Sequence, residues 1–251
     1  MRTLAVALGL LLALVAGGCA TTQQDKESLG KAARDLGEAY MAQGDYRLAL
    51  KELHKALEVT PLDPHVHNDL GLIYLAMKKP VLARRHFEKA VDLRPDYSAA
   101  INNLGSSYLA MDRYDEAIPY FKQVSEMLLY ATPHYPLSNL GYIYYTKKQF
   151  DKSVEYYKKA LEIAPEFAGA LRGLGRTYTA MGRMSEAVKV LNEALEYAPR
   201  FTEAYLDLAT AYLYLGQRKK AVDTLRSAAA IAPKSPQSQE AQRKLDQLLA
   251  K

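Results

Sequence analysis

The side chains best suited to catalysis or metal binding are few, and their spacing assembles no reactive site. The five histidines are His54, His65, His67, His86 and His134. His65 and His67 lie two positions apart, which on a helix places them on different faces, and no His-Glu-x-x-His string occurs. The glycines are spread along the chain and form no phosphate-binding loop. We therefore expect no enzyme, no metal site, no cofactor and no small-molecule substrate.

The single cysteine, Cys19, comes shortly after an apolar stretch of the sequence. Residues 4–15 form an apolar stretch that is too short to span a membrane, and Ala-Gly-Gly separates it from Cys19. This arrangement is similar to a lipobox. The resemblance implies a signal peptide over residues 1–18, acyl chains on Cys19 that anchor the protein to a membrane, and a polar tether over residues 19–29. Ala20 stands where inner-membrane lipoproteins have Asp, so we expect the periplasmic face of the outer membrane.

A repeated pattern determines which elements position the rest of the chain. Leu-Gly-x-x-Tyr, followed by Ala, a bulky apolar residue, Ala and Pro, recurs at a spacing of 34 residues, which is typical of a helical repeat array. The copies start at Gly30, Pro64, Ser98, His134, Ala168 and Thr202. The pattern resembles the tetratricopeptide repeat. It implies an all-α protein in which six helix pairs over residues 30–235 stack into a right-handed superhelical solenoid, with a C-terminal capping helix over residues 236–251.

One tyrosine in each copy is predicted to fill the core between the paired helices. These residues are Tyr40, Tyr74, Tyr108, Tyr144, Tyr178 and Tyr212. Because a large aromatic ring buries much apolar surface and recurs at one repeat position, we interpret the set as core packing.

The third copy departs from the pattern. Leu129 replaces its closing proline, two extra residues precede the fourth copy, and Pro119 lies inside the expected second helix, where it should kink or shorten the first turns. One interpretation is a tolerated insertion in a loop. The other, which we favour because the inserted residues are apolar, is a local change of pitch that shapes a binding site.

The concave side of the solenoid is the predicted binding site, for an extended segment of another protein. Asn can pair with a peptide backbone, Tyr and Leu can anchor side chains, and the pair Arg172 and Arg176 could bind a carboxylate. The predicted groove residues are Asn68, Leu72, Leu75, Asn102, Asn103, Leu109, Tyr135, Asn139, Tyr142, Tyr145, Arg172 and Arg176. The alternative is a solvated groove in which the asparagines serve solubility. Arg34 and Glu38 replace the clamp residues of tail-binding tetratricopeptide domains, so acidic C-terminal tails should not bind in that manner.

The charge pattern points away from nucleic acid. The chain has 33 Lys and Arg against 28 Asp and Glu, a net charge of +5. The charges alternate in sign along the predicted helix faces, which is typical of solvated surface.

The third-copy insertion carries a more specific resemblance. The string Leu129-Tyr130-Ala131-Thr132-Pro133, followed by Asn139-Leu140-Gly141, is similar to the corresponding stretch of the type IV pilus pilotin lipoproteins (the PilF/PilW/Tgl type). This resemblance implies a factor that binds the secretin subunit and assists its assembly in the outer membrane, so that pilus extrusion and twitching motility depend on it. Two alternatives stay open: a general periplasmic adaptor lipoprotein that scaffolds envelope enzymes or proteases, and an enzyme of unrecognised type.

Overall fold

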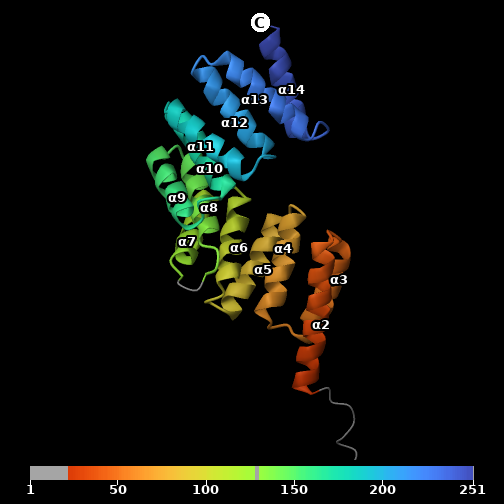
Figure 1. Cartoon of the computed structure of the whole chain (residues 1–251). Helices are drawn as coiled ribbons and strands as arrows, with labels where there is room; N and C mark the ends of the chain where they lie inside the picture. The colour runs from red at the N-terminus through yellow and green to blue at the C-terminus, as the bar shows by residue number, and fades with distance from the viewer. Residues whose placement is uncertain (1–21, 128–129, 251) are drawn as a thin grey trace, which may run out of the picture. The chain divides into compact units, whose positions relative to one another are not determined.

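The computed structural model describes residues 22–127 and 130–250, which form helices joined by short turns (Figure 1). The predicted signal peptide, the predicted lipidation site Cys19 and part of the third-copy insertion lie outside the described residues. The described helices divide into two compact units, residues 1–103 and 104–251.

The first unit contains two helix pairs and the first half of a further helix. The pairs are α2 (Gln23–Ala42) with α3 (Tyr46–Val59), and α4 (Pro64–Ala76) with α5 (Pro80–Leu93). The unit boundary falls inside α6 (Ser98–Leu109). Its core is formed by buried side chains such as Leu53, Leu70 and Ile73.

The second unit holds the rest of α6 and eight further helices. They are α7 (Tyr114–Ser125), α8 (His134–Thr146), α9 (Phe150–Ile163), α10 (Ala168–Ala180), α11 (Met184–Tyr197), α12 (Thr202–Tyr214), α13 (Arg218–Ile231) and α14 (Pro236–Leu249). Within each repeat copy, the first helix (helix A) and the second (helix B) are joined by a short turn.

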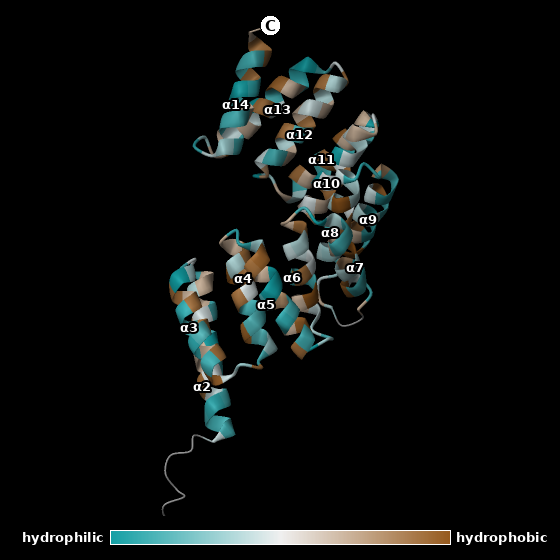
Figure 2. Cartoon of the chain, turned by 180° about the vertical axis from the view of Figure 1, so that it is seen from behind, coloured by the Kyte–Doolittle hydropathy of each residue, from teal (hydrophilic) through white to brown (hydrophobic). Residues whose placement is uncertain are grey.

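The predicted all-α solenoid of helical repeats is confirmed within the described residues, which contain no strand. From the second copy onward, helix A begins at the predicted residue of every copy. Each helix carries both hydrophilic and hydrophobic residues (Figure 2), as expected of amphipathic helices that bury one face against their neighbours. No helix in the described part of the chain has the length and apolar character needed to cross a membrane.

The first helix starts earlier than predicted. It begins at Gln23 rather than Gly30, so residues 23–29, which we assigned to the polar tether, are helical. The reason is a capping box: the Thr22 hydroxyl accepts from the Asp25 backbone N–H at 3.1 Å, and the Asp25 carboxylate accepts from the Thr22 N–H at 2.9 Å.

Paired helices approach closely because small residues on helix A face bulky side chains on helix B. The Tyr157 ring of α9 packs against both Gly141 of α8 and Gly173 of α10. A Cβ atom at Gly141 would lie 2.8 Å from the Tyr157 ring, and one at Gly173 would overlap its hydroxyl end. Any side chain at these two positions would therefore force the Tyr157 ring or its helix to shift.

The repeated tyrosines are core residues, as predicted. Tyr108, Tyr144 and Tyr178 are buried, and Tyr108 stacks on Tyr120 of α7 with ring centres 5.6 Å apart. In the first, second and last copies the equivalent tyrosines are half-buried.

The prediction for Pro119 is wrong about where helix α7 is shortened. α7 begins at Tyr114, 34 residues after the start of α5, and it continues through Pro119. It ends at Ser125 and so has 12 residues, whereas the second helices α5 and α9 have 14. The missing residues are at its C-terminal end, next to the insertion.

The capping helix α14 closes the last copy. The Ser235 hydroxyl caps its first turn by accepting from the Ser238 N–H at 3.2 Å, and Pro236 occupies the first turn, where its missing N–H is not needed. Ala241 and Leu245 pack with Leu225 of α13 in one cluster, whereas Leu249 stays exposed. α14 thus covers apolar surface that another repeat would otherwise bury.

Candidate protein-binding groove

Three neighbouring hollows follow the A helices of the second unit and together form a groove. The first and second share Tyr145 and Arg176, and the second and third share Thr210. Their volumes are about 390, 410 and 280 Å³. These volumes lie near the lower end of the range for whole small-molecule ligands, which is about 300–1,000 Å³, so each hollow suits a side chain of an extended partner.

The first hollow combines aromatic rings with positive charge. Tyr142, Tyr145 and Phe150 line it together with Lys148 and Arg176, and its described lining residues include no carboxylate. The Arg176 guanidinium lies 4.9 Å from the centre of the Tyr145 ring, a cation–π contact that holds the cation beside the hollow.

The second hollow is lined by a carboxylate, Asp207, which is ion-paired with an arginine of the preceding copy. The Arg172 Nε of α10 donates to the Asp207 Oδ2 of α12 at 2.6 Å. Burial raises the pKa of Asp207, while Arg172 opposes that shift. The predicted carboxylate site at the arginine pair is therefore corrected: Arg172 already holds a carboxylate of this chain, and among the described residues Arg176 has none bonded to it.

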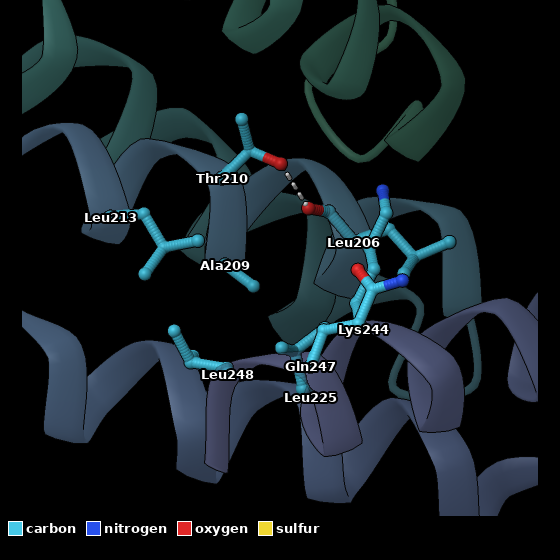
Figure 3. Close-up of a pocket in the computed structure, with 8 residues that line it drawn as sticks. All are labelled: Leu206, Ala209, Thr210, Leu213, Leu225, Lys244, Gln247 and Leu248. Atoms are coloured by element: carbon cyan, nitrogen blue, oxygen red, sulfur yellow. Dashed lines mark hydrogen bonds between the residues drawn. The ribbon is translucent and has the colours of Figure 1, made fainter. Parts of the chain in front are cut away.

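The third hollow is apolar and lies beside the capping helix (Figure 3). Ala209 and Leu213 of α12, Leu225 of α13 and Leu248 of α14 line the same space (Figure 3). Thr210 of α12 and Lys244 and Gln247 of α14 supply the polar part of the lining. Leu213 is 43% exposed, so this apolar surface is reachable from solvent.

In the first unit, one predicted groove residue belongs instead to an internal polar network. The Asn68 side chain is 5% exposed; its oxygen accepts from Asn103 Nδ2 at 2.9 Å, and its nitrogen donates to Asp69 at 3.3 Å. The amide we expected to pair with a peptide backbone is therefore already in use. Asn103 joins the same network and is half-buried.

A buried carboxylate ends this network. Asp69 is 7% exposed, and its Oδ2 lies 4.0 Å from Arg34 Nε, which also contacts Glu38 at 3.1 Å. Burial and the neighbouring Glu38 raise the pKa of Asp69 to about 7. The network joins α2, α4 and α6 through an ion contact and amide hydrogen bonds that the sequence pattern alone did not predict.

The other predicted groove residues are surface or half-buried side chains on helix A. Tyr135 is exposed and packs edge-on against Phe167 with ring centres 5.2 Å apart. The half-buried set is Leu72, Leu75, Asn102, Leu109 and Asn139. Of the twelve predicted residues, the structure brings Tyr142, Tyr145 and Arg176 together in the groove of the second unit.

Sequence reasoning missed several groove residues. Lys148 and Phe150 come from the turn after α8 and from the start of α9, outside helix A. Tyr214 is the last residue of α12 and is 68% exposed. A scan for large apolar residues at surface positions of the repeat could have found Tyr214, because exposed apolar patches mark binding sites.

Metal-ligating groups do not cluster in the described residues. No three His, Cys, Asp or Glu side chains there could hold an ion together. The Nδ1 atoms of His67 and His86 lie 3.3 Å apart, and the other ring nitrogen of His67 lies 3.3 Å from the Pro61 carbonyl. This is a hydrogen-bonded pair of neutral imidazoles, since burial, His67 and His54 lower the pKa of His86 to about 4.

Stacked helix pairs and an open groove lined by aromatic, cationic and aliphatic side chains define a helical-repeat protein of the kind that holds other chains. The sequence models of the tetratricopeptide repeat match residues 28–96, 64–129, 96–166, 132–200 and 179–245. The chain therefore belongs to the tetratricopeptide repeat family, and its fold is a protein-interaction scaffold. No curated protein sequence matches it at a significant level.

Solved structures with the same fold include two type IV pilus biogenesis proteins. PilW, described as a widely conserved type IV pilus biogenesis factor, is 24% identical with a TM-score of 0.78, over 84% of this chain and 97% of that one. PilF of Pseudomonas aeruginosa is 21% identical with a TM-score of 0.74, over 87% and 99%. YrrB, described as having an unusual peptide-binding site, is 21% identical with a TM-score of 0.54, over 76% and 97%. This chain thus resembles the PilF/PilW family of repeat proteins.

Proposed function

We propose that this protein is a pilotin: an outer-membrane lipoprotein, anchored through Cys19, that binds the secretin subunit of a type IV pilus machine and assists its assembly. The observation that carries the proposal is the match to PilW and PilF, which extends along 97% and 99% of those chains. The lipobox-like sequence before Cys19 and the insertion after the third copy support it further.

The groove of the second unit is the proposed secretin-binding site. It offers the rings of Tyr142 and Tyr145 and the cation of Arg176 along one open surface. Tyrosine and arginine dominate the binding energy of many protein interfaces. Holding an extended segment requires no bond to be made or broken, so we expect binding without catalysis.

Affinity capture from membranes tests this function. The full-length protein with Tyr145→Ala and Arg176→Ala should retain its helicity but recover at least about tenfold less secretin, because it loses an aromatic anchor and a cation. Tyr197→Ala with Arg226→Ala makes the same two changes at exposed positions on α11 and α13. This control should capture secretin normally.

Two outcomes would contradict the proposal. Equal recovery by both double variants would place the binding surface elsewhere. Recovery of proteases or peptidoglycan enzymes in place of secretin would favour the general adaptor.

A further inference from the structure

We infer that the groove of the second unit selects an extended segment that carries an acidic side chain and, further along toward α14, an aliphatic side chain. This inference names the chemistry of the bound segment and rests on the proposed protein-binding role. It requires no particular partner, so it can be tested without secretin.

The acidic residue is specified by the first hollow. Lys148 and Arg176 supply two positive charges there, and the described lining residues include no carboxylate. Arg176 is held against Tyr145, so its guanidinium is partly pre-positioned to donate two parallel hydrogen bonds to a carboxylate.

Other charges near the groove leave this preference in place. Asp207 is engaged by Arg172 at 2.6 Å, and Lys244 pairs with Glu240 at 2.9 Å. Each of these carboxylates is thus offset by its own cation. Arg176 also lowers the pKa of Asp207, but Arg172 is the cation bonded to that carboxylate. Lys148 and Arg176 therefore leave the first hollow with excess positive charge, which attracts a negative group.

The aliphatic residue is specified by the third hollow. Leu213, Leu225 and Leu248 surround about 280 Å³ between α12, α13 and α14 (Figure 3). The volume suits one branched side chain, whose burial removes apolar surface from water on both sides. Thr210 lines both this hollow and the central one, so one continuous segment can reach both sites.

A set of synthetic probes tests the inference on the purified full-length protein. The probes are labelled, amidated twelve-residue peptides of Gly and Ser with one Glu and one Leu, separated by two to five residues. An extended chain advances about 3.3–3.6 Å per residue, so the set covers a range of spans. Binding is measured by fluorescence anisotropy at low salt.

We expect one spacing to bind best. Replacing its Glu with Gln should weaken binding at least about fivefold, because a charge-assisted hydrogen bond is lost. That difference should vanish in the Arg176→Gln and Lys148→Gln proteins and persist in Arg226→Gln. Replacing the Leu with Ser should also weaken binding. The Leu248→Gln protein should bind the Leu and Ser probes with equal affinity.

The outcomes that overturn the inference are specific. Equal binding of the Glu and Gln probes overturns it, and so does tighter binding of a Lys probe than of the Glu probe. A set in which no spacing binds better than a peptide of Gly and Ser alone also overturns it. Secretin capture can succeed in each of these cases, so failure here is separate from failure of the pilotin proposal.

Discussion

At the scale of single residues, the structure depends on small side chains opposite large rings. Tyr157 shows this most clearly, since it fills the space beside Gly141 of α8 and Gly173 of α10. Glycine inside a helix costs about 1 kcal/mol relative to alanine. The close approach of the ring outweighs that cost, because a well-packed core does not tolerate an added atom.

Gly173→Ala should therefore lower the free energy of unfolding by about 1–3 kcal/mol through overpacking. Adding Tyr157→Leu should recover part of the loss, since the two sites are in contact and their effects are not additive. Urea unfolding of the single and double variants measures both effects. An increase of about 1 kcal/mol in the free energy of unfolding of Gly173→Ala, as helix propensity alone predicts, would contradict this packing account.

A second prediction at the residue scale concerns the buried carboxyl of Asp69. Its pKa is raised to about 7, whereas an unfolded aspartate titrates near pH 4. The folded state therefore holds the proton more tightly, so this group stabilises the fold at low pH and that contribution is lost as pH rises through 7. Between pH 5 and pH 8 the free energy of unfolding of the wild type should fall by at least about 1 kcal/mol relative to that of the Asp69→Asn protein. Urea unfolding of both proteins at the two pH values is the test. Equal changes in the free energy of unfolding of the two proteins between these pH values would contradict the prediction.

At the scale of elements, the turn between helix A and helix B uses one backbone conformation in all six copies. Its left-handed residue is Gly44, Gly182 or Gly216 in three copies, with φ between 69° and 79°. In the other three it is Lys78, Asp112 or Lys148, with φ of 57° or 58°. An L side chain is strained there.

Lys78→Gly should raise the free energy of unfolding by about 0.5–1 kcal/mol, since relief of strain exceeds the entropy that glycine adds to the unfolded chain. Gly182→Ala is the matched opposite change, and a Cβ there meets no atom within 4 Å, so any loss reflects the backbone alone. Thermal unfolding of the two variants should give shifts of opposite sign. A destabilised Lys78→Gly protein would show that the lysine side chain matters more than the turn.

At the scale of the whole molecule, the period of 34 residues predicted nearly every element. A fixed repeat places the same residue types at the same structural positions, so helix starts such as Pro64 and Thr202 followed directly from the sequence. Features outside the period were harder to predict. The early start of α2 depends on the local capping box of Thr22 and Asp25, which precedes the first copy.

The candidate site was predicted only in part, because position in a repeat does not reveal what a side chain bonds to. Asn68 and Arg172 occupy predicted groove positions, yet Asn103, Asp69 and Asp207 from this chain already engage them. Lys148 enters the groove from a turn. Such contacts between copies depend on which residues meet across them, and a pattern within one copy does not contain that information.

The proposed membrane anchor gives a prediction for the whole protein. Cys19→Ala removes the only thiol of the chain, so no acyl chain can be attached and the protein should leave the outer-membrane fraction. Membrane fractionation with immunodetection measures this. Cys19→Ala protein that still sorts to the outer membrane would refute the lipoprotein assignment.

The most direct test of the central claim is photo-crosslinking from the groove itself. A benzophenone amino acid placed at Tyr145 in the membrane-bound protein should form a covalent adduct with the secretin subunit, identified by mass spectrometry. The same probe at Tyr197, exposed on helix α11, should form none. Secretin adducts from Tyr197 but not from Tyr145 would contradict the account, because the partner would then bind a surface other than the groove.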